Sequence, residues 1–290
     1  MDLERRIASR LSELTPNDLQ VARHLVSELP HTAFGSAQEI ADQLGVSKAA
    51  VVRCANRLGY QGFTELRKAL RDYVNQQLES PVELFQEHRR SLEEDSAAVV
   101  AERLGQALQN LQELAASAKS ERLDDIARRL ARADRIVVAG ERKSWGLAVY
   151  AAHILRMLRP GAEVWPTPSQ PLPEMALDLS ESDALMALTF RRYSNSVLRL
   201  ARVAQEQGTW VLALTDSIVA PIVAASDETI ICPTEDVSFV DSMVSPTFVI
   251  ETIAVRLSRE LGPQVNERLE GNESLAEESG LFVRSPTRRG

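Results

Sequence analysis

The fold of the amino-terminal part is decided by the stretch AQEIADQLGVSKAAVVRCANRL, residues 37–58. Gly45 stands between two short helical segments, where a left-handed turn strains glycine less than other residues. Ala41 is small enough for two helices to cross closely, and Ser47 can cap the second helix. Apolar residues fall on the inward faces at helical spacing: Ile40, Leu44, Val46, Val51 and Cys54. This arrangement predicts a helix-turn-helix, whose second helix enters the major groove of DNA.

The outward face of the predicted second helix carries small and polar side chains that suit a DNA groove. Residues 47–71 hold six lysines and arginines against Glu65 alone, a charge distribution that favours phosphate contacts. The predicted DNA-contacting residues are Ser47, Lys48, Ala49, Val52, Arg53, Asn56 and Arg57. Three cations of the next helix belong either to this interface or to a solvated helix face: Arg67, Lys68 and Arg71.

The chain has 290 residues, which suggests two domains, and 44% of them are hydrophobic, enough for ordinary globular cores. Only 5% are aromatic, so aliphatic side chains must fill most of the core. The formal net charge of −8 is unusual for a protein that binds nucleic acid. Residues 1–80, however, hold ten basic and ten acidic residues, so the acidic surplus belongs to the rest of the chain.

The two cysteines, Cys54 and Cys232, lie too far apart for a metal-binding spacing, and they form no disulfide framework. The four histidines are dispersed. The first residues are charged and lack the apolar run of a signal peptide. No stretch of about 18 apolar residues is present, so no transmembrane helix is expected. We therefore predict a cytoplasmic protein with no membrane partner, no bound metal and no cofactor.

Helical patterns fill residues 1–79, the expected DNA-binding domain. Helices are predicted over residues 2–14, from Thr15-Pro16 to about Leu29, over the two segments of the motif and over 64–78, with a loop at 31–35. Residues 80–118 are predicted to be a linker and a connecting helix. Its apolar residues are expected to face inward: Val99, Val100, Leu104, Leu108, Leu111 and Leu114.

The pattern changes in residues 119–262, where short apolar runs alternate with helical segments. Strands are predicted over 136–139, 162–165, 184–189, 210–214 and 229–232. Helices are predicted over 120–132, 144–158, 194–207, 222–225 and 243–261. This alternation predicts an α/β domain with a doubly wound, parallel, five-stranded sheet covered on both faces. The remaining residues, 263–290, are expected to be a polar, partly disordered tail.

Ligands of open α/β sheets bind beyond the carboxyl ends of the strands. Three predicted loops lie there, at residues 140–144, 189–194 and 215–217. The first two place hydroxyl groups and cations at helix N-termini, where free N–H groups and the helix dipole favour anions. The cations are Arg142, Lys143, Arg191 and Arg192. The loops therefore predict a site for an anionic ligand, either a phosphate or a carboxylate.

The helix-turn-helix and the LGYQGFTEL stretch that follows it, residues 58–66, resemble the RpiR/MurR-type bacterial transcriptional regulators. So does the order of the domains, a helical head followed by a sugar-isomerase-type (SIS) α/β domain. The resemblance covers roughly residues 5–260. It implies a head that binds operator DNA as a dimer or higher oligomer. It also implies a SIS domain that senses a small effector, often a phosphosugar, and carries the oligomer contacts.

One loop departs from the pattern of that family. SIS domains usually carry a Ser-x-Ser-Gly-x-Thr loop that cradles a phosphate, whereas this chain has TFRRYS over 189–194. Arg191 and Arg192 stand where the inner Ser-Gly pair would be, and guanidinium groups bind anions bidentately. The change favours a small organic acid or a phosphate held by arginines. The predicted effector residues are Arg142, Ser144, Thr189, Arg191, Arg192, Ser194 and Asp241.

Some of these assignments have alternatives. Arg191 and Arg192 can instead form salt bridges between subunits. Asp216 can be a helix cap, an acceptor for a ligand hydroxyl or an acid–base group. Asp241 and Ser242 can line the pocket or cap the closing helix.

The sequence predicts a DNA-binding transcriptional regulator, a homodimer or homotetramer, whose SIS-like domain senses a small anionic metabolite. The alternative is a SIS-fold phosphosugar isomerase or a related carbohydrate-derivative enzyme. Isomerisation needs a positioned base. Glu141 is the only carboxylate of the first loop, and Ser196 stands where isomerase-like loops commonly carry Glu, so no catalytic residue is predicted. A third alternative is a regulator that binds ligand and protein, with DNA secondary; the outward Lys48 and Arg53 disfavour it.

Overall fold

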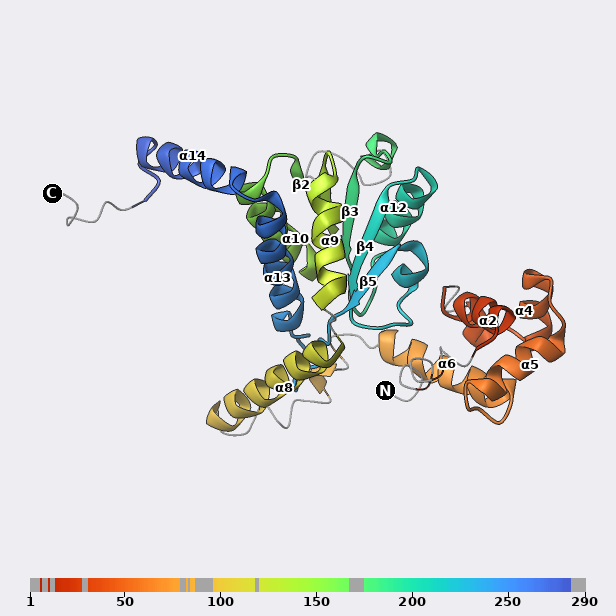
Figure 1. The fold of residues 1–290 in the computed structure, drawn as a ribbon. Coiled ribbons are helices and arrows are strands. Elements are labelled where there is room, and N and C mark those ends of the chain that lie inside the picture. Colours follow the sequence, from red (N-terminus) through yellow and green to blue (C-terminus); the bar gives the residue numbers. More distant parts are fainter. Residues whose placement is uncertain are drawn as a thin grey trace.

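The computed structural model shows a helical head beside an α/β domain, with two further helices extending from that domain (Figure 1). It describes residues 6, 10, 14–27, 31–78, 82, 84–86, 96–117, 120–166 and 175–282. Most of the helix predicted over residues 2–14 and of the linker over 81–95 lies outside these residues. So does the end of the predicted tail, from residue 283 onward. No helix of the described residues is long and apolar enough to cross a membrane.

The described residues of the head form five helices: α2 (Pro16–Ser27), α3 (His31–Phe34), α4 (Ala37–Leu44), α5 (Lys48–Arg57) and α6 (Phe63–Leu78). The loop predicted at 31–35 is wrong, because residues 31–34 form the short helix α3. Its conformation is fixed by tertiary contacts: the hydroxyl of Thr32 donates to the carbonyl of Leu25 at 2.6 Å, and Ala33 is fully buried.

The turn between α4 and α5 forms as its sequence predicts. Ser36 and Glu39 form a capping box that closes the start of α4. Gly45 ends that helix with a φ of 65°, in the left-handed region. The side chain of Ser47 then accepts from the backbone N–H of Ala50, which caps α5. These local interactions fix the angle between the two helices.

The core of the head is mostly aliphatic and is completed by the other domain. Val21, Ile40, Val51 and Leu70 are buried within it. Val219, which follows the fourth strand of the α/β domain, is also fully buried in this cluster. The head and the α/β domain therefore share part of one hydrophobic core.

The α/β domain has five parallel strands in the order β2-β1-β3-β4-β5, as predicted for a doubly wound sheet. The strands are β1 (Ile136–Gly140), β2 (Ala162–Trp165), β3 (Ala184–Leu188), β4 (Trp210–Thr215) and β5 (Glu228–Ile231). The helices around them are α9 (Ser120–Arg132), α10 (Lys143–Leu158), α12 (Asn195–Glu206) and α13 (Val244–Leu261). The described residues of the domain also form two 3₁₀ turns, η2 (Ala176–Asp178) and η3 (Pro221–Ala225).

Alternate residues of the central strands pack against different layers of helices. On one face, Val138 and Met186 pack with α9, α10 and α13. On the other face, Val137 and Leu185 pack with α12 and the two 3₁₀ turns. Figure 1 shows these two layers on either side of the sheet. Because both faces are covered, the strands read as continuous apolar runs in the sequence.

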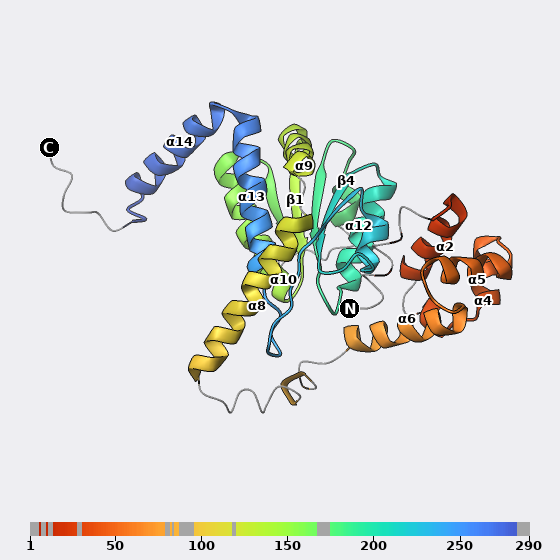
Figure 2. The same ribbon diagram turned by 60° about the horizontal axis from the view of Figure 1, so that its bottom comes forward.

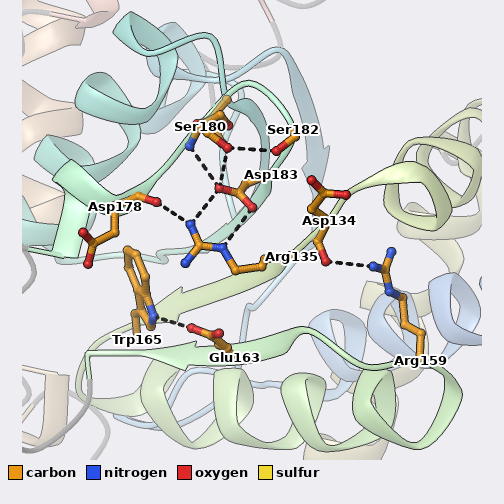
Figure 3. A network of polar contacts seen from close by, with 10 residues as sticks. Asp134, Arg135, Arg159, Glu163, Trp165, Asp178, Ser180, Ser182 and Asp183 are labelled. Atoms are coloured by element: carbon orange, nitrogen blue, oxygen red, sulfur yellow. Dashed lines mark hydrogen bonds and ion pairs between the residues drawn. The ribbon is translucent and has the colours of Figure 1, made fainter.

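A polar network at the amino-terminal edge of the sheet is shown in Figure 3. Arg135 donates two hydrogen bonds to the carboxylate of Asp183, at 3.0 and 2.8 Å, and the hydroxyl of Ser180 donates to the same group at 2.9 Å. Burial raises the pKa of Asp183, but the hydrogen bonds from Arg135 and Ser180 outweigh it and leave the pKa below its usual value. This network holds the edge opposite the predicted ligand loops.

Two helices extend from the domain in both views, α8 (Ser96–Ser117) and α14 (Gln264–Glu278) (Figures 1 and 2). The prediction that all the apolar residues of α8 face inward is wrong. Val100, Leu104 and Leu108 are 68%, 60% and 52% exposed, whereas Leu114 is buried in the core of the domain and Leu111 packs beside it. Helix α14 lies within the predicted polar tail, and Val265 is the one residue that its described part buries.

Candidate functional site

The outward face of α5 is the candidate DNA interface. Lys48, Arg53 and Asn56 are exposed, as are Ser47 and Ala49, and Val52 is half-buried. The inward side of the same helix buries Val51, Cys54 and Ala55. The sequence-predicted DNA-contacting residues therefore lie along one accessible side of a capped helix.

Arg57 differs from the other residues of this face because it also holds the head together. Its guanidinium pairs with the carboxylate of Asp18 in α2 and donates to the hydroxyl of Thr15 at 3.1 Å. Burial raises the pKa of Asp18, but Thr15 and Arg57 outweigh it and leave the pKa below its usual value. The Arg57 side chain remains 45% exposed, so this pairing orients it and leaves part of it accessible.

On α6, one of the three basic candidates also has a role within the head. Arg71 donates to the carbonyl of Ala33 at 2.9 Å, and its guanidinium lies 5.3 Å from the centroid of the Phe34 ring. Lys68 is exposed and Arg67 is half-buried. Arg71 therefore ties α6 to α3, and Lys68 is the more accessible cation.

The loops after β1, β3 and β4 meet at the carboxyl edge of the sheet, as the sequence predicts. The Ser194 hydroxyl caps α12 by accepting from the backbone N–H of Val197. It also donates to the carboxylate of Glu141 in the first loop. The backbone N–H of Ser194 donates to the hydroxyl of Thr189 at 3.0 Å. The predicted effector residues Thr189 and Ser194 thus form a closed turn beside the first loop.

Cations and carboxylates alternate at this edge. The guanidinium of Arg191 pairs with Glu235 at 3.1 Å, and the ammonium of Lys143 pairs with Asp241. The backbone N–H of Arg191 also donates to Asp216 at 3.0 Å. We call these five residues the charged cluster. Its carboxylates therefore pair with the same cations that an anionic ligand would need.

Three arginines lie close enough to the Lys143 ammonium to act on it. Burial lowers the pKa of Lys143 to about 8; Asp216 raises it, and the charges of Arg191, Arg142 and Arg192 lower it further. All four predicted cations therefore converge on one region. Burial also raises the pKa of the Asp216 carboxyl, against the opposing effect of Arg191.

Two arginines of these loops adopt an uncommon backbone conformation. Arg142 has a φ of 55° and Arg192 a φ of 64°, and they are the only non-glycine residues with positive φ in the described part of the chain. A left-handed conformation costs most L-residues about 1–2 kcal/mol. Arg192 stands at the glycine position of the usual SIS loop, and its positive φ is one that glycine adopts without strain. Such strain is typical of functional sites.

Close packing shapes the first loop. A Cβ on Gly140 would lie 2.5 Å from the carbonyl oxygen of Ser144, so β1 and α10 approach more closely there than other residues allow. Ser144, a predicted effector residue, is buried at 4% exposure, and Thr189 is buried at 2%. Arg142 and Arg192 are exposed. Two hydroxyl residues of the predicted site are therefore buried and two of its cations face solvent, whereas Arg191 is half-buried.

Three residues of this edge were not predicted from the sequence as site residues: Glu235, Tyr193 and Ser217. Glu235 lies in the segment after β5, a fourth strand-end loop that the order of the strands could have indicated. That segment is also tied to α8, because Asn110 donates to the carbonyl of Glu235 at 2.8 Å and Arg103 pairs with Asp236 at 3.0 Å. The connecting helix thus contacts the charged cluster directly.

Both cysteines are buried, as expected of core residues. Burial raises the pKa of the Cys54 thiol to about 12 and raises that of Cys232 as well. Among the described residues, no group of three histidines, cysteines, aspartates or glutamates is placed to hold a metal ion.

Comparison with known families matches both halves of the chain. The model described as the helix-turn-helix domain of the rpiR family matches residues 1–77. The model of the SIS domain matches residues 129–256. The chain therefore carries both modules in the order that its sequence resemblance implies.

Solved structures share this fold at low sequence identity. The Vibrio vulnificus NanR protein complexed with ManNAc-6P is 20% identical, with a TM-score of 0.55 over 97% of this chain and 100% of that chain. The sugar isomerase domain of an RpiR transcription factor from Sphaerobacter thermophilus is 21% identical, with a TM-score of 0.58 over 61% and 98%. A putative phosphosugar isomerase from Bacteroides fragilis is 15% identical, with a TM-score of 0.50 over 62% and 100%.

Proposed function

Because the chain belongs to the rpiR family of helix-turn-helix proteins with a SIS domain, we propose that it is an effector-controlled transcriptional regulator. The observation that carries this proposal is the exposed side of α5, where Lys48, Arg53 and Asn56 stand together on a helix that Ser47 caps. A recognition helix presents its residues to base edges and phosphates in this way. The whole-chain charge of −8 does not oppose it, since the acidic surplus lies outside the head.

The experiment is binding of the purified chain to its own upstream DNA, measured by fluorescence anisotropy at 50 and 200 mM salt. If about 6–10 phosphates are neutralised, affinity falls by about 10³–10⁵-fold over this range. Replacing Lys48 and Arg53 with Ala should weaken binding and lower the salt slope by roughly one for each phosphate that is no longer neutralised.

The matched control removes the same charge from the α/β domain, by replacing the exposed Arg132 and Arg259 with Ala. This control should leave DNA binding unchanged. Equal weakening in both double variants would mean that total charge, and not the α5 face, determines binding. No preference for upstream over unrelated DNA would contradict the proposal.

We further propose that the effector is a small anion that binds at the charged cluster. Arg191 and Lys143 are each paired with a carboxylate, so a phosphate or carboxylate ligand can take the places of Glu235 and Asp241. Since Glu235 contacts α8 through Asn110, displacement of the Glu235 carboxylate by the ligand would change the contacts of α8. The ligand then acts through different affinities for two arrangements of the chain.

A thermal-shift panel tests this part, with ManNAc-6P, inorganic phosphate and citrate as probes. A bound probe at about 100 times its dissociation constant stabilises the protein by about 2.7 kcal/mol. ManNAc-6P is included because the NanR structure holds it. Stabilisation should be lost in Arg191→Leu and retained in Arg199→Leu, which changes an exposed arginine of α12. Equal shifts in both variants would contradict the proposed site.

A regulatory role accords with the arrangement around Glu141 better than catalysis does. The Glu141 carboxylate accepts from the Ser194 hydroxyl that caps α12, so it is held in a structural contact. An isomerase needs a base free to take a substrate proton. Turnover of ManNAc-6P or arabinose 5-phosphate by the full chain would favour the enzyme.

We propose that the protein is a homodimer that buries the apolar side of α8. Val100, Leu104 and Leu108 are exposed there, and a groove of about 400 Å³ lies alongside, between α8 and α13. Exposed apolar patches of this kind mark protein interfaces. Leu104→Glu should shift the mass measured by light scattering toward the monomer, whereas Gln109→Glu, the same charge on exposed α8 surface, should not. An unchanged mass in Leu104→Glu would contradict this interface.

A further inference from the structure

Tyr73 belongs to the head, yet its hydroxyl lies inside the α/β domain. It comes from α6, is 5% exposed, and donates to the hydroxyl of Ser217 at 3.0 Å. The Tyr73 and Tyr193 hydroxyl oxygens lie 3.2 Å apart. Ser217 follows β4 and Tyr193 follows β3, so one head residue contacts two of the ligand loops.

The contacts continue into the charged cluster. Tyr193 hydrogen-bonds to the carboxylate of Asp216, which also accepts from the backbone N–H of Arg191. Tyr193 thus contacts both the Asp216 carboxylate and the Tyr73 hydroxyl. A shift of Arg191 or Asp216 toward a ligand therefore changes the surroundings of the Tyr73 hydroxyl.

Apolar packing holds the same loop to the head. Val219 and Ile218 pack into the core of α2–α6, and the backbone N–H of Val219 donates to the Ser217 hydroxyl at 3.0 Å. Ser217 is thus fixed between the sheet on one side and the head on the other. Figure 1 shows α2 and α6 next to this part of the α/β domain.

We propose that Tyr73 is a positioning residue of the effector site, so that the DNA-binding head itself senses whether that site is occupied. This inference rests on the proposed anionic effector and names a residue through which it acts on the head. The hydroxyl links Ser217 and Tyr193 only while the head is docked. Effector binding and head position are therefore linked, and each alters the other by the same factor.

The test compares Tyr73→Phe with Tyr60→Phe in the full chain. The Phe variant keeps the ring and removes the hydroxyl, and one hydrogen bond corresponds to about a fivefold change in an equilibrium. Tyr60 is buried in the same core, with its ring 4.8 Å from the Arg6 guanidinium, so its variant controls for a lost head hydroxyl. The first readout is amide hydrogen exchange of residues 63–74 and 215–220 without ligand. We expect exchange about fivefold faster in Tyr73→Phe and unchanged in Tyr60→Phe.

The second readout is the affinity for inorganic phosphate and ManNAc-6P by calorimetry. We expect Tyr73→Phe to change the affinity several-fold, and the ligand-induced change in exchange of residues 63–74 to disappear. A structural effect on folding alone would not remove that ligand response. Ser217→Ala removes the acceptor from the other domain and should reproduce both effects, so the test stands even if Tyr73→Phe folds poorly.

The outcomes separate this inference from the proposed function. If wild type binds a probe and both Tyr73→Phe and Ser217→Ala behave as wild type, the role of Tyr73 is contradicted while the effector site stands. If wild type binds none of the probes at millimolar concentration, the anionic effector and the role of Tyr73 are both contradicted.

Discussion

The backbone N–H of Arg191 donates to the carboxylate of Asp216 at 3.0 Å, which joins the loop after β3 to the loop after β4. The same residue extends its guanidinium to Glu235, after β5. One arginine therefore fixes three strand-end loops relative to each other. A ligand that draws this side chain away breaks its pair with Glu235 and so releases the contact to the loop after β5.

Replacing Glu235 with Gln should strengthen anion binding. The Arg191 guanidinium then loses a competing carboxylate and faces a neutral amide, so the ligand no longer displaces a charged partner. We expect a two- to tenfold tighter dissociation constant for inorganic phosphate by calorimetry. Glu260→Gln, on the exposed side of α13, removes the same charge and should have no effect. A weaker affinity in Glu235→Gln would show that this carboxylate supports the ligand.

Replacing Arg192 with Gly should raise the free energy of unfolding. Arg192 has a φ of 64°, which glycine adopts without strain. We expect the relief of backbone strain to exceed the entropic cost of glycine, so the free energy of unfolding should rise by about 0.5–1 kcal/mol. The same change at Arg199, inside α12, should lower stability by about 1 kcal/mol. Urea denaturation of both variants measures these opposite changes in the free energy of unfolding. Destabilisation in both variants would show that the Arg192 backbone is not strained.

Anion binding should weaken as the pH rises through about 8. Burial lowers the pKa of Lys143 to about 8, so its ammonium is largely protonated below that pH and largely neutral above it. A bound anion favours the protonated form, and binding at pH 8 should therefore take up protons. Calorimetry in two buffers of different ionisation enthalpy, from pH 7.5 to 9.5, measures this uptake.

The control for this pH dependence is Lys143→Arg, whose guanidinium remains protonated over the whole range. Its phosphate affinity should be nearly constant between pH 7.5 and 9.5. A wild-type affinity that does not change over this range would show that Lys143 does not contact the anion.

Replacing Asp183 with Asn should lower the free energy of unfolding by roughly 2–3 kcal/mol at pH 7, because hydrogen bonds to charged groups are removed beside Arg135. The pKa of Asp183 is lowered in the folded protein, so its contribution is present above the unfolded pKa and is lost as the pH falls below about 3.8. Asp125→Asn, in an exposed pair with Arg128, should cost almost nothing. Urea denaturation at pH 7 and pH 3 compares them.

The sequence predicts those features of the fold that neighbouring residues determine. Gly45 and Ser47 fix the turn between α4 and α5 through their own backbone and side chains, and both behave as predicted. The five strands are apolar runs because both faces of the sheet are covered. The convergence of Arg191 and Lys143 follows from the rule that parallel strands end at one edge of a sheet.

The remaining features depend on contacts that leave no local trace. Tyr73 and Ser217 are 144 residues apart, and nothing in either neighbourhood indicates their hydrogen bond. The period of Leu104 and Leu108 indicates an apolar side of α8, but a period does not say which surface covers it. Among the described residues of the chain, that side of α8 stays exposed.

The burial of Val219 among the helices of the head bears on how such proteins can be recombined. A truncated chain that ended after α6 would have a cavity at the position of the Val219 side chain. A fusion of the head to another sensor domain would need an apolar residue that fills this cavity. The head therefore cannot be exchanged between proteins without a matching residue, and its evolution is constrained by the sequence of the loop after β4.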